Sequence, residues 1–284
     1  MNWFDSWALT LTILIPAVAA FAIMVIPRAE EEAIKWVALV GSVATFAVLV
    51  GILFRFDYDH SSLVNKFEVN KEWIPVINSR YHVAIDGISL PLLALSAFIT
   101  VLCVVYSWNH FPEPYNPKAF LALILILEVG MNGTFIAEDL ILFFVFFEVV
   151  LLPMFFMIGV WGGPNREYAS IKFFLFTLFG SALMLLGFLA LYFKVDVAPG
   201  PAVVHSFDMV LLTHAHGAGL VHSTQMLIFG AMFLGFAIKV PMCWTPGWKN
   251  APESASCISN GTFSSKPPTL SMSEVKPSKS TSTA

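Results

Sequence analysis

Four charged side chains stand out inside long apolar runs of this 284-residue chain, namely Glu128, Glu148, Lys172 and Lys239. A charged side chain at the centre of a membrane helix costs at least roughly 2.5–3.5 kcal/mol. Such residues persist where they face protein or water and serve a function. Carboxyl and amino groups can hold and release protons, so these four residues point to proton transfer across a membrane.

Glu148 and Lys239 are the pair with the clearest chemistry. Glu148 follows Leu140 by eight residues, which places it roughly 12 Å into a helix, with no polar neighbour in its own run. Lys239 precedes Pro241, which breaks helical hydrogen bonds, and broken helices are typical of ion-transport sites. Burial disfavours a charged lysine and a nearby carboxylate favours it, so movement of the carboxylate would switch the proton on the lysine. Each residue could instead have a purely structural role. Glu148 could be protonated and hydrogen-bonded to a neighbouring helix, and Lys239 could extend to the membrane surface.

Glu128 and Lys172 are candidates for relay groups. Glu128 is a second acid in the middle of an apolar run, with the same structural alternative as Glu148. Lys172 lies only three residues after Ala169, where its run begins, so the alternative is a lysine that anchors the helix end at the interface. Asp86, at the start of another run, is interpreted as a helix-end carboxylate, because negative charge is favourable at a helix N-terminus.

The composition sets the solvent in which these charges must work. Hydrophobic residues make up 57% of the chain and charged residues 12%, against about 25% charged in a soluble domain. This excludes a soluble globular enzyme and a disordered chain. The net charge of -4 also gives no basic patch for nucleic acid. We therefore expect an integral, multi-pass membrane protein with the lipid bilayer as a partner.

The elements that must position the charges are transmembrane helices. Runs this long are helices, because lipid leaves no partner for free backbone groups and barrel strands need only about 9–11 residues. The sequence predicts an all-α polytopic bundle of about seven spans within a domain of residues 1–242. The predicted spans are 7–27, 36–54, 85–108, 118–137, 140–161, 169–193 and 223–242. The polar stretch between the second and third spans must lie outside hydrocarbon, and loop charges leave the side of the N-terminus open.

Other chemistry is poorly supported. The three cysteines are far apart and form no CxxC pair. His214 and His216 could form a metal pair, but no cysteine or carboxylate stands at ligand spacing, which favours a solvated loop. The chain has no glycine-rich phosphate loop and no haem or iron–sulfur signature, so we expect no redox cofactor in it.

Four stretches carry a resemblance to a known family: 81–90, 140–154, 169–181 and 233–241. In this order they resemble the antiporter-like proton-translocating subunits of respiratory complex I, most closely the subunit M (chain 4) type of bacterial NADH:quinone oxidoreductase. The resemblance covers about residues 1–242. It implies that Glu148 of the fifth helix pairs with Lys239 of a seventh helix broken at Pro241, and that Glu128 matches a fourth-helix glutamate.

The resemblance also implies a place in a larger assembly. Such a subunit translocates protons while NAD, FMN, Fe–S clusters and quinone are bound by partner subunits. Its partners would be other membrane-arm subunits, in a bacterial plasma (inner) membrane. Multisubunit sodium/proton antiporters and membrane-bound hydrogenases share these motifs, so a subunit of either is the alternative.

The sequence departs from the family after residue 242. The family continues with further helices, whereas residues 243–284 are polar and rich in Ser, Thr, Pro and Lys. We expect this tail to be disordered and to come from a frameshifted or misjoined end. Only the first of the family's two inverted repeats would then be partly present. A truncated, non-functional structural fragment is therefore a third interpretation.

Overall fold

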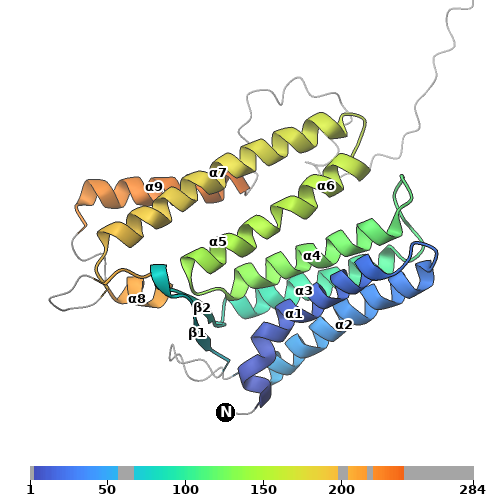
Figure 1. Ribbon diagram of the computed structural model, residues 1–284, viewed down its shortest axis with the longest axis horizontal. Coiled ribbons are helices and arrows are strands. Elements are labelled where there is room, and N and C mark those ends of the chain that lie inside the picture. The colour runs from blue at the N-terminus through green and yellow to red at the C-terminus, as the bar shows by residue number, and fades with distance from the viewer. Residues whose placement is uncertain (1–2, 57–66, 198–203, 216–219, 240–284) are drawn as a thin grey trace, which may run out of the picture. The chain divides into compact units, whose positions relative to one another are not determined.

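The computed structural model describes residues 3–56, 67–197, 204–215 and 220–239, and its architecture is a helical bundle with a small hairpin at one end (Figure 1). The elements are, in order, α1 (Trp3–Val25), α2 (Glu31–Arg55), β1 (Val69–Ile74), the 3-10 helix η1 (Pro75–Ile77), β2 (Ser79–Val83), α3 (Ser89–Tyr106), α4 (Pro117–Ile136), α5 (Leu140–Val149), α6 (Leu151–Trp161), α7 (Arg166–Lys194), α8 (Met209–His214) and α9 (His222–Lys239). The predicted all-α membrane fold is confirmed.

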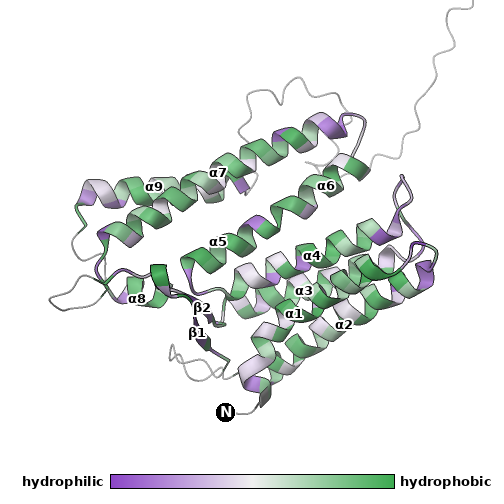
Figure 2. Ribbon diagram, in the orientation of Figure 1, coloured by the Kyte–Doolittle hydropathy of each residue, from purple (hydrophilic) through white to green (hydrophobic). Residues whose placement is uncertain are grey.

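Among the described residues, six helices are long and apolar enough to cross a membrane, and they match the first six predicted spans. The fifth of these is formed by α5 and α6 together. Figure 2 shows hydrophobic residues along these helices and hydrophilic residues mainly towards their ends. Large apolar side chains also point outward, such as Phe21 and Phe54, as expected for a surface that faces lipid.

The seventh predicted span is present as α9, but the first turn of this helix is polar. It begins with His222, Ser223, Thr224 and Gln225 and ends at Lys239, and it is not among the six apolar helices of the described chain. Residues 240–242 of the predicted span, including Pro241, lie outside the described residues, as does the tail 243–284.

Two helix interfaces position the candidate site, one around α4 and one between α7 and α9. The helix α4 packs against α1, α2, α3 and α5, and α9 packs along α7. In the second interface Gly235 lets α9 approach α7 closely, since an added Cβ would lie 2.9 Å from the Gly180 carbonyl oxygen and 2.7 Å from Met184 Cβ. Small residues permit such close backbone contact in membranes. This contact sets where Lys239 lies along the bundle.

A close approach at Gly133 joins α4 to α5, and it gives a testable prediction. An added Cβ at Gly133 would overlap the ring of Phe146. Gly133→Ala should therefore lower the free energy of unfolding by about 1–3 kcal/mol, the usual effect of overpacking. Denaturant unfolding in detergent micelles would measure it. Gly230→Ala is the matched control, because nothing lies within 4 Å of a Cβ there; equal stabilities of the two variants would contradict the packing.

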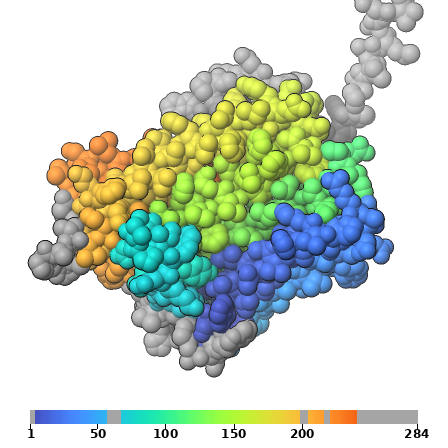
Figure 3. Space-filling view, viewed as in Figure 1, coloured from blue at the N-terminus to red at the C-terminus, as the bar shows by residue number. Residues whose placement is uncertain are grey.

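The polar stretch after α2 contains a hairpin that was not predicted. Strands β1 and β2 pair antiparallel, with Asn70 opposite His82. The hairpin is joined to the end of α4 by a bridge between Val83 and Ala137. Phe67, Val83 and the helix residues Leu9 and Ile136 share one buried apolar cluster. In Figure 3 the hairpin residues accordingly cover this end of the bundle, beside α1 and α5.

Candidate proton-transfer site

The structure brings Lys239 of α9 against α5 beside Glu148. The Lys239 Nζ donates a hydrogen bond to the Phe147 carbonyl oxygen at 2.6 Å. The same ammonium group lies 3.5 Å from the centroid of the Phe147 ring. Its charge also interacts with the Glu148 carboxylate, although no ion pair within 4.0 Å joins the two among the described residues. The predicted pair is therefore adjacent, with the lysine held by the residue before the glutamate.

The backbone next to Glu148 explains how α5 can receive the lysine. Pro153 has no N–H to donate to the Val149 carbonyl, so the helix is interrupted between α5 and α6. The neighbouring backbone hydrogen bonds are long, at 3.4 Å from Val150 N to the Phe146 oxygen and 3.4 Å from Met154 N to the Val150 oxygen. A weakened stretch of helix leaves carbonyl oxygens open to an outside donor.

Glu148 keeps an unused acceptor at this point. Its side chain is half-buried, and its Oε1 is buried with no hydrogen-bond partner in the described structure. A buried carboxylate oxygen without a partner gains strongly from a proton or a cation. The Lys239 ammonium, which bonds the preceding residue of α5, is a donor that a small movement could bring to this oxygen.

Glu128 lies on a different face of the bundle. It is fully buried, with 0% of its surface exposed, and neither carboxyl oxygen has a partner in the described structure. One turn later on the same face of α4, Asn132 donates to the Thr12 carbonyl at 3.1 Å and accepts from the Ser96 hydroxyl at 3.4 Å. That face therefore looks towards α1 and α3. The face of α4 that packs against α5 carries Gly130 and Gly133, and Gly130 lies two residues, or about 200°, from Glu128. The relay role of Glu128 remains a prediction.

Lys172 and Asp86 lie at helix ends. Lys172 is exposed in the second turn of α7, and its ammonium lies 5.8 Å from the centroid of the Tyr168 ring. This favours the interfacial anchor, and its relay role remains a prediction. The Asp86 carboxylate accepts from the backbone N–H groups of Ile88 at 3.0 Å and Ser89 at 2.6 Å, which confirms the helix-end interpretation.

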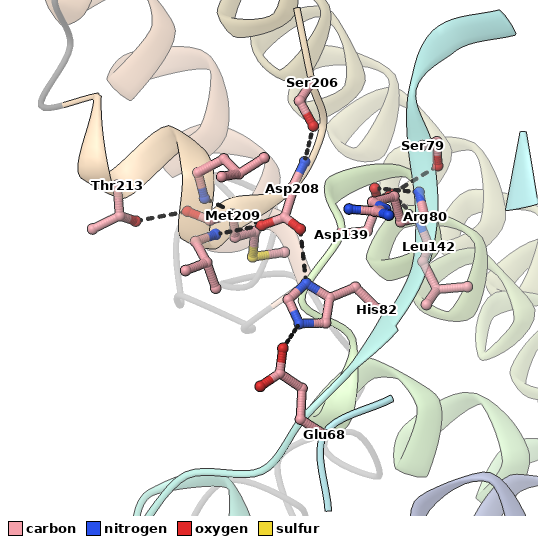
Figure 4. A network of polar contacts seen from close by, with 12 residues as sticks. Glu68, Ser79, Arg80, His82, Asp139, Leu142, Ser206, Asp208, Met209 and Thr213 are labelled. Carbon is pink, nitrogen blue, oxygen red and sulfur yellow. Dashed lines mark hydrogen bonds and ion pairs between the residues drawn. The ribbon is translucent and has the colours of Figure 1, made fainter. Parts of the chain in front are cut away.

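A second polar cluster, centred on His82, escaped the sequence analysis (Figure 4). Both ring nitrogens of His82 contact carboxylates, Nδ1 with Asp208 at 2.8 Å and Nε2 with Glu68 at 2.9 Å. Beside it, Asp139 caps α5 by accepting from the N–H groups of its first turn. His82 lies inside the first stretch of family resemblance, 81–90, and this position was the one feature of the sequence that could have drawn attention to it. Its partners, 14 and 126 residues away, gave none.

Two family models match adjacent parts of the chain. The model described as NADH-ubiquinone oxidoreductase chain 4, amino terminus, matches residues 10–134. The model described as NADH:quinone oxidoreductase/Mrp antiporter, TM, matches residues 137–266.

Curated relatives agree with these models. The chain is 34% identical to NADH-quinone oxidoreductase subunit M of Rickettsia felis over 263 residues, covering 89% of this chain and 50% of the relative. It is 32% identical to NAD(P)H-quinone oxidoreductase chain 4 3 of Trichormus variabilis, covering 89% of this chain and 46% of the relative. The chain thus spans about half the length of the curated relatives that it matches.

Solved structures share the fold. A chain of respiratory complex I from Thermus thermophilus matches with a TM-score of 0.65 and 25% identity, over 82% of this chain and 44% of that one. A chain of the Mrp complex from Dietzia matches with a TM-score of 0.63 and 16% identity, over 82% of this chain and 23% of that one, which is a likeness of fold.

Proposed function

Because the chain belongs to the family of antiporter-like membrane subunits of NADH:quinone oxidoreductase, subunit M (chain 4) type, we propose that it is a membrane-arm subunit that couples quinone reduction to proton translocation. The observation that carries the proposal is the contact of Lys239 with α5 beside the unpartnered Glu148 oxygen. Lys239 and Glu148 thus place a basic and an acidic side chain near each other inside the apolar bundle.

The geometry suggests how the pair handles a proton. In the observed arrangement the ammonium of Lys239 is held by the carbonyl and ring of Phe147, and Glu148 has a free carboxylate oxygen. When the ammonium approaches Glu148, the ion pair favours the charged lysine. When it withdraws into apolar surroundings, desolvation favours release of its proton. Alternation between the two positions would load and unload one proton.

The remaining parts of the machinery would lie in other chains. We place NAD, FMN, the Fe–S clusters and quinone in partner subunits, with this chain contributing no redox chemistry of its own. Its partners would be other membrane-arm subunits, and the membrane would be the bacterial plasma membrane, as the bacterial relatives suggest.

Replacement of Glu148 tests the proposal in the intact membrane complex that contains this chain. Glu148→Gln keeps the size of the side chain and removes the charge. We expect NADH-driven acidification of sealed vesicles to fall at least tenfold, since the lysine loses its switching partner. Glu113→Gln, in the exposed turn before α4, is the matched control. Wild-type acidification rates in Glu148→Gln would refute the assignment.

A sodium/proton antiporter subunit is the second candidate, because one matching family model also describes Mrp antiporters. The same vesicles separate the two functions. Acidification that needs NADH and quinone supports the oxidoreductase, whereas proton movement driven by a sodium gradient without either substrate supports the antiporter.

A further inference from the structure

We propose that His82, Asp208 and Glu68 form a proton-binding site at the membrane surface, and that its bound proton holds the segment before α8 against the hairpin. The site lies outside the spanning helices and goes beyond the coupling pair of the proposed function. Figure 4 shows the imidazole between the two carboxylates, which come from the segment before α8 and from the residue before β1.

The contacts of the imidazole require an extra proton. Its ring is nearly inaccessible, with 4% of the His82 side chain exposed against 2% for Asp208 and 32% for Glu68. A neutral imidazole has one N–H and one lone pair, so it can donate to only one of two ionised carboxylates. Donation to both requires an imidazolium. If the ring is neutral instead, one carboxyl group must carry the proton.

The surroundings place that proton on the ring. The Asp208 carboxylate also accepts from the backbone N–H groups of Val210 at 2.9 Å and Leu211 at 3.2 Å, which favours its ionised form. Burial raises the pKa of Asp208, but these bonds and the one to His82 outweigh it and lower the pKa overall. Burial alone lowers the pKa of His82, but its bonds and charges to Asp208 and Glu68 outweigh that, and the pKa is raised.

Other titratable groups around the site add negative charge. Glu138, from the turn between α4 and α5, has its pKa raised mainly by burial, and the negative charges of Asp86, Asp208 and Glu68 raise it further while His82 lowers it. Asp139 in the same turn is committed to four hydrogen bonds, two of them from Ser79 Oγ and the Arg80 N–H. The hairpin strands also carry titratable groups, namely Lys71, Glu72, Arg80 and Tyr81. The Lys71 ammonium lies over the Trp7 ring, Glu72 is opposite Arg80, and the Tyr81 hydroxyl bonds Thr10. His205, on the segment that carries Asp208, directs its Nδ1 to the Val195 carbonyl instead.

The site joins segments that are distant in sequence. Around Asp208, the Met209 N–H donates to the Glu138 carbonyl at 2.8 Å, and the Leu140 N–H donates to the Phe207 carbonyl at 2.9 Å. The Asp208 carboxylate is also the N-cap of α8. The segment between α7 and α9 is thus tied to the hairpin through His82 and to the α4–α5 turn through backbone hydrogen bonds.

The pH dependence follows from the directions of the shifts. Because the His82 pKa is raised on folding, its stabilising contribution is complete below the ordinary histidine pKa of about 6.5 and is lost as pH rises through the raised value. Because the Asp208 pKa is lowered, its contribution is present above the ordinary aspartate value and is lost as pH falls through the lowered one. The contacts of His82 are therefore most stable at a pH between the ordinary pKa of aspartate and that of histidine. As pH rises through the raised His82 pKa, the segment before α8 is released from the hairpin.

Nitrogen-15 NMR of histidine-labelled full-length chain in detergent micelles tests the protonation directly. In a pH titration we expect one histidine to keep both ring nitrogens protonated to a higher pH than the other histidines, a signal absent from His82→Asn and present in His110→Asn. His110 is a suitable control because it lies outside the site, stacked on Tyr106. A His82 ring that loses its second proton at the same pH as the other histidines, or at a lower pH, would overturn the proposal.

Amide hydrogen exchange tests the mechanical role. After correction for intrinsic rates, we expect the amides of 209–215 to exchange at least tenfold faster in His82→Asn than in wild type at pH 7, and wild type to approach the variant as pH rises. Amides of α4 should not change. Unchanged exchange in 209–215 would overturn the proposal, and His82→Gln provides a second variant should His82→Asn fail to fold. Neither measurement involves quinone or proton transport, so either proposal can fail without the other.

Discussion

Lys239→Ala should abolish proton translocation coupled to quinone reduction, with residual coupled activity below about a tenth of the wild-type rate. The substitution removes the ammonium that bonds the Phe147 carbonyl and interacts with the Glu148 charge. Without a group that alternately holds and releases a proton, the acid alone cannot complete a cycle. The measurement is NADH-driven acidification of sealed vesicles that contain the assembled membrane complex, alongside the rate of quinone reduction.

Two variants make this result specific to the lysine. Lys194→Ala removes an exposed lysine in the last turn of α7, outside the candidate proton-transfer groups, so it should leave coupling near the wild-type rate. Lys239→Arg keeps a cation that does not release its proton, so it should assemble normally yet remain uncoupled. Wild-type coupling in Lys239→Ala, or full coupling in Lys239→Arg, would exclude a proton-switching lysine.

Glu128→Leu should make the bundle more stable, by about 1–3 kcal/mol in the free energy of unfolding. Both Glu128 oxygens are fully buried without a hydrogen-bond partner in the described structure, and an unsatisfied buried polar group costs free energy of this size. A leucine of similar volume fills the same space without that cost. Denaturant unfolding in micelles measures the stability, and vesicle acidification measures the effect on coupling.

Asn132 provides the control for Glu128, one turn further along the same face of α4. Its amide bonds the Thr12 carbonyl and the Ser96 hydroxyl, so Asn132→Leu should destabilise the bundle where Glu128→Leu stabilises it. A gain in stability together with a loss of coupling in Glu128→Leu would mean that the carboxyl is retained for proton relay. A loss of stability would contradict the unpartnered environment of Glu128.

The membrane fold could be predicted because its signal is local. An apolar run of about 20 residues must become a helix in lipid whatever its neighbours are, so six spans follow from counting along the chain. The start of α9 was predicted to within one residue, at 223 against His222, although its first turn is polar. The hairpin was missed because each of its strands is short, and its pairing depends on contacts with the ends of α4 and α1.

Reading along the chain identified the charged residues inside apolar runs as candidates for proton transfer, because charge is scarce in this chain and each buried charge is costly. It did not determine their partners. Counted from the starts of their helices, Glu148 and Lys239 lie at depths of roughly 12 and 24 Å, yet the lysine contacts α5 beside the glutamate. The offset of α9 along α7, fixed by close packing at Gly235, brings them together.

The remaining arrangement depends on how the helices and the hairpin pack. This packing turned Glu128 towards α1 and α3, and it enclosed His82 between carboxylates 14 and 126 residues away. The cost of burying a charge depends on one residue and its solvent, so this cost can be inferred from the local sequence. The hydrogen bonds that offset this cost depend on how the helices pack, which no local pattern encodes.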